Sequence, residues 1–187
     1  MKKQSRLVLV VGAAMAISSM GAFAQGQGSV EAEVFTKRYF TDSSHDMQNG
    51  NLVGASASYF ITDNISTGIS YGEYHHIKSD NAFADGRKKK VNGEQYTLDG
   101  TYSFGEAGSA LRPYVTAGIG HQSLSNLPER TGRNHTTFLS VGAGAKYYLT
   151  ENIYAKAGID GIHGLDSNQS EWMAGAGVGY NFGKIGK

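Results

Sequence analysis

Two polar residues, His121 and Ser123, have the types and the spacing needed for nucleophilic chemistry. Residues two apart in a strand lie on the same face, so the imidazole could act as a general base for the serine hydroxyl. Such a pair would attack an ester, and it needs a third group that orients the histidine. The nearest downstream carboxylate is Glu129, six residues past Ser123. A His-x-Ser tripeptide is also frequent by chance, so no catalytic residue is assigned and ester hydrolysis is the alternative hypothesis.

The other histidines do not have the spacing of a metal centre. They fall at predicted strand ends or in loops: His45, His75, His76, His135 and His163. The adjacent His75 and His76 would point to opposite faces of a strand, which is poor geometry for holding one ion. The chain has no cysteine. We expect no metal site and no cofactor.

Seven charged residues lie on those faces of the predicted strands that otherwise carry glycine, serine and threonine. They are Glu31, Glu33, Lys37, Asp99, Lys146, Lys156 and Asp160. If this face lines the interior of a closed sheet, the charges must pair with one another or meet water. We expect a luminal network of ion pairs. It would either control a narrow path for ions or only fill and stiffen the interior.

These positions depend on eight segments in which apolar residues alternate with small or polar ones. The last segment is the clearest, because every second residue from Trp172 to Phe182 is apolar or aromatic. Its eleven residues match the length of a tilted strand that crosses a bilayer. The predicted strands are 29–40, 52–60, 65–74, 94–104, 113–124, 137–149, 153–163 and 172–182. Short and long connections alternate between them, as in outer-membrane barrels.

Aromatic residues gather at the ends of the apolar strand faces. The predicted girdle consists of Tyr59, Tyr102, Phe104, Tyr147, Trp172, Tyr180 and Phe182. Trp172 begins the last segment, whereas the others end alternate strands at one level, where rings would meet a membrane–water interface. A soluble barrel around a small ligand would turn its apolar face inward instead. The pattern therefore predicts an all-β fold, an eight-stranded antiparallel transmembrane β-barrel.

Residues 1–24 have the three parts of a secretory signal peptide. A basic start with Lys2, Lys3 and Arg6 precedes an apolar stretch at 7–17 and the small-x-small site at 22–24. We expect a cleaved leader followed by a barrel domain over residues 25–187. Removing three basic residues changes the formal charge from +1 to −2, so no bulk charge favours nucleic acid as a partner.

Several stretches of the mature chain are similar to one family. They are Lys37-Arg38-Tyr39-Phe40-Thr41-Asp42-Ser43, Ser70-Tyr71-Gly72-Glu73-Tyr74-His75, Leu111-Arg112-Pro113-Tyr114-Val115, Gly144-Ala145-Lys146-Tyr147-Tyr148 and Glu171-Trp172-Met173-Ala174-Gly175. In these stretches the chain resembles the N-terminal barrel of the OprF group of Pseudomonas porins, within the wider OmpA-like family. Family members usually continue into a periplasmic peptidoglycan-binding domain. The sequence stops at Lys187, so we expect the barrel's roles without cell-wall anchoring.

We expect a monomer in the outer membrane of a Gram-negative bacterium. The closing Gly177-x-x-Tyr180-x-Phe182 resembles the signal read by the barrel-assembly machinery. Outer-membrane lipids are expected partners, and the basic run 87–90 is suited to lipopolysaccharide phosphates.

Eight strands enclose an interior that side chains largely fill. We therefore expect a structural barrel with at most narrow, low-conductance, porin-like ion passage. The alternative is a lipid A-modifying, deacylase-like enzyme that uses His121 and Ser123, because one type of outer-membrane deacylase carries His-x-Ser on a strand.

Overall fold

The computed structural model describes residues 25–40, 50–78, 90–125, 135–166 and 170–184, which form eight strands. The strands are β1 (Ser29–Phe40), β2 (Asn51–Phe60), β3 (Ile65–Lys78), β4 (Lys90–Ser103), β5 (Leu111–Ser125), β6 (His135–Tyr148), β7 (Ile153–Gly164) and β8 (Ser170–Lys184). The predicted leader at 1–24 lies outside the described residues. Within the described part of the chain, no helix is long and apolar enough to cross a membrane.

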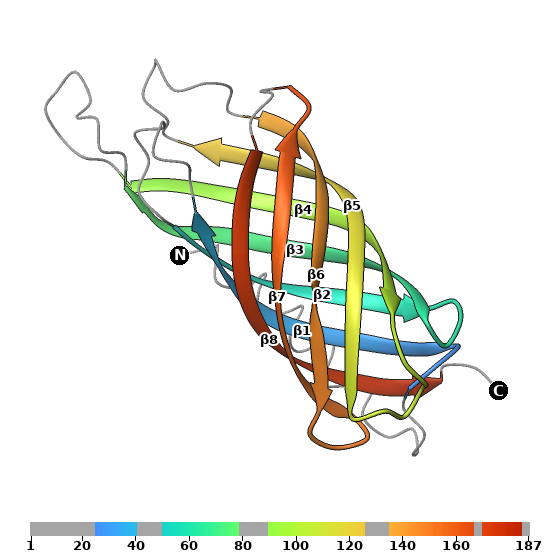
Figure 1. Cartoon of the computed structure of the whole chain (residues 1–187). Helices are drawn as coiled ribbons and strands as arrows, with labels where there is room; N and C mark the ends of the chain where they lie inside the picture. Colours follow the sequence, from blue (N-terminus) through green and yellow to red (C-terminus); the bar gives the residue numbers. More distant parts are fainter. Residues whose placement is uncertain (1–24, 41–49, 79–89, 126–134, 167–169, 185–187) are drawn as a thin grey trace, which may run out of the picture.

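Each strand pairs antiparallel with the next, and β8 pairs with β1 to close the barrel (Figure 1). The connections at 61–64, 104–110 and 149–152 lie at one end of the barrel, which is the periplasmic end in outer-membrane barrels. The eight-stranded antiparallel barrel predicted from the alternation is confirmed.

Two strand boundaries differ from the prediction in ways that change the interior. β5 begins at Leu111, before Pro113, because a proline is tolerated close to the start of a strand. Arg112 is therefore a strand residue, and it is buried in the barrel. β8 continues to Lys184.

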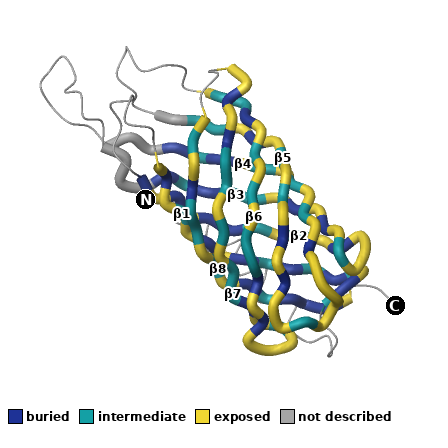
Figure 2. Tube along the Cα trace, viewed as in Figure 1, coloured by how far each residue is buried: buried dark blue, intermediate teal, exposed yellow. Residues whose placement is uncertain are grey.

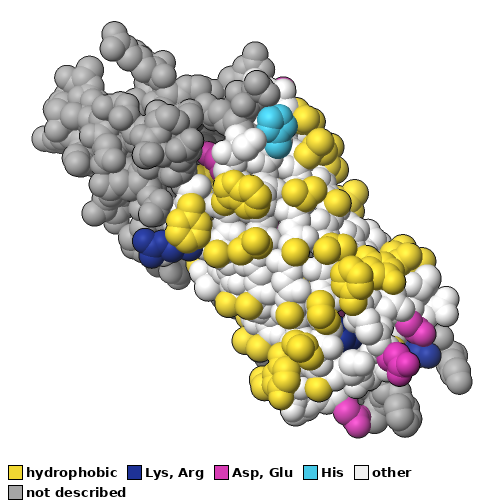
Figure 3. All heavy atoms as spheres, in the orientation of Figure 1, with side chains coloured by type: hydrophobic (Ala, Val, Ile, Leu, Met, Phe, Trp, Pro, Cys, Tyr) yellow, Lys and Arg dark blue, Asp and Glu magenta, His cyan; other side chains and the backbone are white. Residues whose placement is uncertain are grey.

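Buried and exposed residues alternate along the strands, as Figure 2 shows. Outward side chains in the middle of the strands are apolar, such as Ile69 on β3 and Val141 on β6. Figure 3 shows hydrophobic side chains spread over the visible wall of the barrel. Such a surface suits lipid, because an apolar belt of this kind surrounds outer-membrane barrels.

The interior is filled by large side chains that lie over glycines on neighbouring strands. A Cβ atom added to Gly120 would lie 2.2 Å from Cζ of Phe138, and one added to Gly179 would lie 2.2 Å from Cζ of Tyr154. The narrow lumen of an eight-stranded barrel leaves no room for two large residues at such neighbouring positions. Glycine opposite a large residue thus explains part of the high glycine content of the chain.

Replacing Gly144 by alanine is expected to destabilise the barrel by about 1–3 kcal/mol, the usual cost of overpacking. The new Cβ would lie 2.2 Å from the backbone oxygen of Ala157 and 2.6 Å from the Tyr114 hydroxyl. Gly100→Ala is the matched control, because the nearest atom to its Cβ is 4.0 Å away. Urea unfolding of both variants in lipid vesicles measures the difference. Equal stabilities would contradict this account of the glycines.

The seam between β8 and β1 contains a β-bulge. Asn181 pairs with Glu31 and Lys184 with Ser29, so β8 has one extra residue, next to Gly183 with a φ of 75°. A bulge interrupts the regular alternation of faces. Phe182, next to the bulge, is 7% exposed, and its ring packs against that of Tyr180 with centroids 4.9 Å apart.

Candidate functional site: the filled lumen

Glu31 is the centre of a buried cluster near the periplasmic end of the lumen, which we call the charged cluster. Its carboxylate accepts hydrogen bonds from Lys146 Nζ at 2.5 Å, the Tyr148 hydroxyl at 2.8 Å and Asn181 Nδ2 at 3.2 Å. Only 1% of Glu31 is exposed. Since Glu31 is on β1 and Lys146 is on β6, this ion pair spans the interior.

Arg112 adds a second buried cation beside this cluster. It is the strand partner of Lys146, which is in turn the partner of Lys156, so three cations lie on adjacent strands. The Arg112 Nη2 atom donates to the backbone oxygen of Asp63 at 2.7 Å, and its guanidinium lies over the Phe60 ring. Like charges at paired positions repel each other, and the carboxylates from β1 offset this repulsion.

The other predicted charges lie farther toward the outer end. Lys156 Nζ is 3.2 Å from Glu33 and also lies over the Tyr114 ring, and Lys37 Nζ is 2.8 Å from Asp160. These charges line a cavity of about 90 Å³, which is space for a few water molecules.

Asp99 lines the same cavity but is not a partner in any of the three ion pairs described above. Its Oδ1 atom accepts a long hydrogen bond from the Thr101 hydroxyl, 3.5 Å away. All seven charged residues predicted from the sequence thus face the interior.

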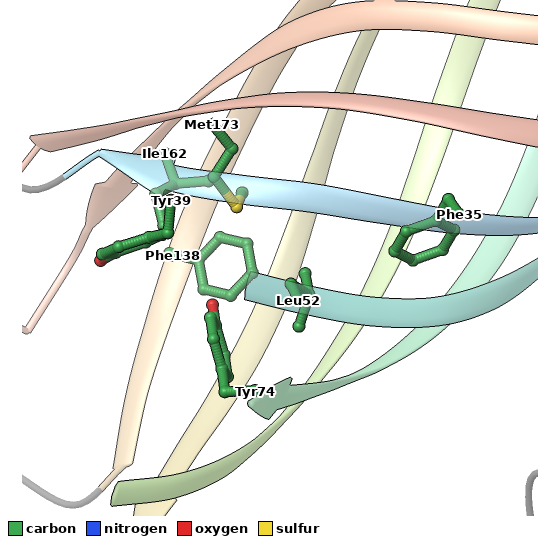
Figure 4. Close-up of a cluster of buried hydrophobic side chains, with 7 residues drawn as sticks. All are labelled: Phe35, Tyr39, Leu52, Tyr74, Phe138, Ile162 and Met173. Carbon is green, nitrogen blue, oxygen red and sulfur yellow. The ribbon is translucent and has the colours of Figure 1, made fainter. Parts of the chain in front are cut away.

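A cluster of buried hydrophobic side chains lies toward the outer end (Figure 4). Its members are Phe35, Tyr39, Leu52, Tyr74, Phe138, Ile162 and Met173. Figure 4 shows Phe35 apart from the other six. From the periplasmic side outward, the lumen therefore holds a charged cluster, a small polar cavity and an apolar cluster.

The aromatic residues predicted to form the girdle lie mainly on the outer wall. Five of them expose 45–60% of their surface: Tyr59, Tyr102, Phe104, Tyr147 and Trp172. The rings of Tyr102 and Phe104 pack edge to face, with centroids 5.0 Å apart. Tyr180 is half-buried beside Phe182.

The structure gives His121 a different partner from the predicted one. Its Nδ1 atom lies 3.5 Å from the Thr137 hydroxyl, and its ring stacks on His135 with centroids 5.8 Å apart. Ser123 is paired along the strands with His135 and with Glu94. Glu129 lies outside the described residues. His121 is exposed on the wall of the barrel and has no described contact with a carboxylate.

Several luminal residues were missed in the sequence. Tyr148 and Asn181 have the inward parity of Lys146 and Gly179, so alternation alone could have identified them. Arg112 was missed because Pro113 was taken as the start of the strand. The outer apolar cluster was missed because its members are inward residues spread over six strands, with no more than two on any one strand.

Comparisons with known proteins agree with this architecture. A family profile described as "OprF membrane domain" matches residues 1–186. The chain is 50% identical to "Outer membrane porin F" of Pseudomonas aeruginosa, over 98% of this chain and 53% of that protein. It is 40% identical to "Outer membrane porin F" of Pseudomonas fluorescens, over 98% of this chain and 56% of that protein. The chain thus spans about half the length of these curated relatives.

A solved structure is similar as well. The crystal structure of the N-terminal β-barrel domain of Pseudomonas aeruginosa OprF matches with a TM-score of 0.66 and 44% sequence identity. The match covers 84% of this chain and 99% of that one.

Proposed function

The chain belongs to the OprF membrane-domain family, and from this premise we propose that it is a structural barrel that passes at most small ions through a narrow, charge-lined lumen. It is a porin-type barrel of the outer membrane. Because the chain covers about half of its curated relatives, the activities of those whole proteins do not enter the proposal.

The buried Glu31–Lys146 pair is the observation that carries this proposal. It spans the lumen, and the Glu33–Lys156 pair lies next to it, so an ion that crosses the barrel must pass both pairs. Fixed charges in a narrow path select ions by sign. The small volume of the cavity limits passage to ions and water.

Single-channel recording of the refolded barrel in a planar bilayer tests ion passage. We expect discrete small steps. Lys156→Glu and the double variant Lys146→Glu/Lys156→Glu should shift the ratio of cation to anion permeability toward cations by about tenfold, which corresponds to about 1.4 kcal/mol. The reversal potential in a salt gradient measures this ratio.

The exchanged pair Glu31→Lys/Lys146→Glu is the matched control, because it reverses both charges and keeps an ion pair. It should leave the selectivity close to that of the natural barrel. Each variant must first show the electrophoretic shift of a folded barrel. A folded barrel without current would overturn ion passage, and unchanged selectivity in the reversed variants would overturn the role of the charges.

The proposal also includes export, assembly in the membrane and contact with lipids. The leader at 1–24 directs export, and the end of β8 is recognised by the barrel-assembly machinery. The barrel is a monomer, and outer-membrane lipids and lipopolysaccharide surround it. The apolar outer wall supports contact with lipid. Of the basic run at 87–90, residues 87–89 lie outside the described residues.

The relatives and the fold favour a non-enzymatic role. Ester hydrolysis by this pair needs His121 within hydrogen-bond reach of Ser123 and a third group that orients the histidine. The described contacts of His121 are instead Thr137 and His135. We therefore assign no catalytic residues.

A further inference from the structure

Each of the eight strands contributes one inward-facing side chain near the outer end of the lumen. We call this set the outer ring: Tyr39, Leu52, Tyr74, Gln95, Gln122, Phe138, Ile162 and Met173, from β1 to β8 in order. Met173 is the strand partner of Tyr39, Leu52 that of Tyr74, and Gln95 that of Gln122. Figure 4 shows its six apolar members grouped together.

The apolar side chains of the outer ring are almost fully buried. Leu52, Phe138 and Met173 each expose 1% of their surface, and Tyr74 exposes 2%. Neighbouring atoms therefore cover these four side chains almost completely. The rings of Tyr39 and Tyr74 pack edge to face with centroids 6.0 Å apart, which links β1 to β3.

The Tyr74 hydroxyl joins the apolar and the amide members of the outer ring. The Tyr74 hydroxyl lies 2.5 Å from Oε1 of Gln95, to which it donates, and 3.3 Å from Oε1 of Gln122. No member of the ring carries a charge. An ion at this level would lose its water and find no charged group to replace it, which is a large penalty.

The outer ring also forms the outer wall of the polar cavity. Gln95, Ile162 and Met173 line that cavity together with Lys37, Asp160 and Ser140. On the inner side of the ring, an ion would therefore meet charged and hydroxyl groups that can replace water. The two parts of the lumen differ in chemistry: the inner part solvates ions, and the outer part does not.

We propose that the outer ring, rather than the charged cluster, is the main barrier between the outer mouth and the lumen, and that Phe138 is the residue that seals it. This inference rests on the proposed function, because it names the barrier on the same path. Apolar constrictions stop ions by excluding water. Phe138 is the largest of the ring members that are 1% exposed, and its ring lies over Gly120 on β5.

A single cysteine in the cavity tests the barrier without relying on conductance. The chain has no cysteine, so Ser140→Cys introduces a unique thiol. Ser140 lies two residues from Phe138 on β6 and lines the cavity. The barrel is reconstituted in lipid vesicles with its outer mouth facing the bath, a membrane-impermeant, positively charged thiosulfonate is added to the bath, and mass spectrometry follows the formation of the mixed disulfide.

We expect slow modification of Ser140→Cys in the natural background, and a rate higher by about tenfold or more after Phe138→Ala. Leu139→Ala is the matched control, because the neighbouring Leu139 is an exposed residue on the outer wall. It should leave the rate unchanged. Phe138→Met, which keeps an apolar side chain of similar length, should also keep the rate low.

Rapid modification with Phe138 in place would overturn the inference, and so would equal rates after Phe138→Ala and Leu139→Ala. A variant that loses the electrophoretic shift of a folded barrel is replaced by Phe138→Val, for which the same rate increase is required. A barrel that is silent in the bilayer but shows the expected thiol rates would refute ion passage and leave the barrier intact. A conducting barrel with equal thiol rates would support ion passage and overturn the barrier at the outer ring.

Discussion

Replacing Glu31 by alanine is expected to lower the free energy of unfolding by about 3–5 kcal/mol, because the change leaves a buried cation without its counter-charge. Lys146 is buried and loses its carboxylate partner, and Tyr148 and Asn181 lose an acceptor at the same time. Urea unfolding from lipid vesicles, followed by tryptophan fluorescence and electrophoretic mobility, measures the change.

Asp160→Ala provides the comparison. Asp160 also pairs with a lysine, Lys37, but their side chains are 16% and 27% exposed, so water can replace the lost partner. We expect a loss of about 1 kcal/mol or less, as for solvated ion pairs. The double variant Glu31→Ala/Lys146→Met should recover part of the stability lost in Glu31→Ala, because it removes the unpaired charge. A loss in Glu31→Ala no larger than in Asp160→Ala would contradict this assignment.

Arginine at Ile69 is expected to cost about 2–4 kcal/mol, the penalty for this side chain at the middle of the lipid-facing wall. Ile69 is 64% exposed and lies within β3, opposite Ala57 and Leu98. Such exposure would be harmless in water, so the penalty depends on lipid around the barrel. The same unfolding assay in vesicles measures it.

Leu149→Arg is the matched control for position. Leu149 is 60% exposed, but it lies in the connection after β6, at the level of the interface. Arginine near an interface costs about 0–1 kcal/mol. Equal effects at Ile69 and Leu149 would indicate that the wall around Ile69 does not face lipid, in agreement with a soluble barrel.

Alternation predicted the fold because two physical demands coincide in a membrane barrel. Every second residue must suit lipid, and the others must fit a narrow interior, so faces can be assigned strand by strand. Glu33 and Asp160, assigned to the inner face in this way, line the cavity of the barrel. The same reasoning also predicted a closed barrel, because paired edges are required in lipid.

The pairing of the luminal charges could not be predicted from alternation. Glu31 and Lys146 are 115 residues apart and meet across the interior. Their contact depends on the tilt and stagger of the strands, which alternation does not specify. The bulge in β8 could not be predicted for a related reason: the extra residue near Gly183 is revealed only by the register with β1.

The outer ring shows a second limit of the sequence. Phe138, Ile162 and Met173 are single apolar residues on mostly polar inner faces, so none of them forms a pattern within its own strand. They become a cluster only when the strands are aligned around the axis. A charged residue, in contrast, can be recognised singly within its own strand, so the sequence indicated the charges as the barrier.

Because glycines lie beneath the large inward side chains, substitutions widen the lumen more easily than they narrow it again. Shortening Phe138 would open space at one step, because Gly120 below it already has no side chain. Once a side chain had been added at Gly120, a phenylalanine at 138 could no longer return, and closing the lumen again would require both positions to change. In a family built this way, a wider lumen is reached by single substitutions, whereas a sealed one persists only as long as its glycines do.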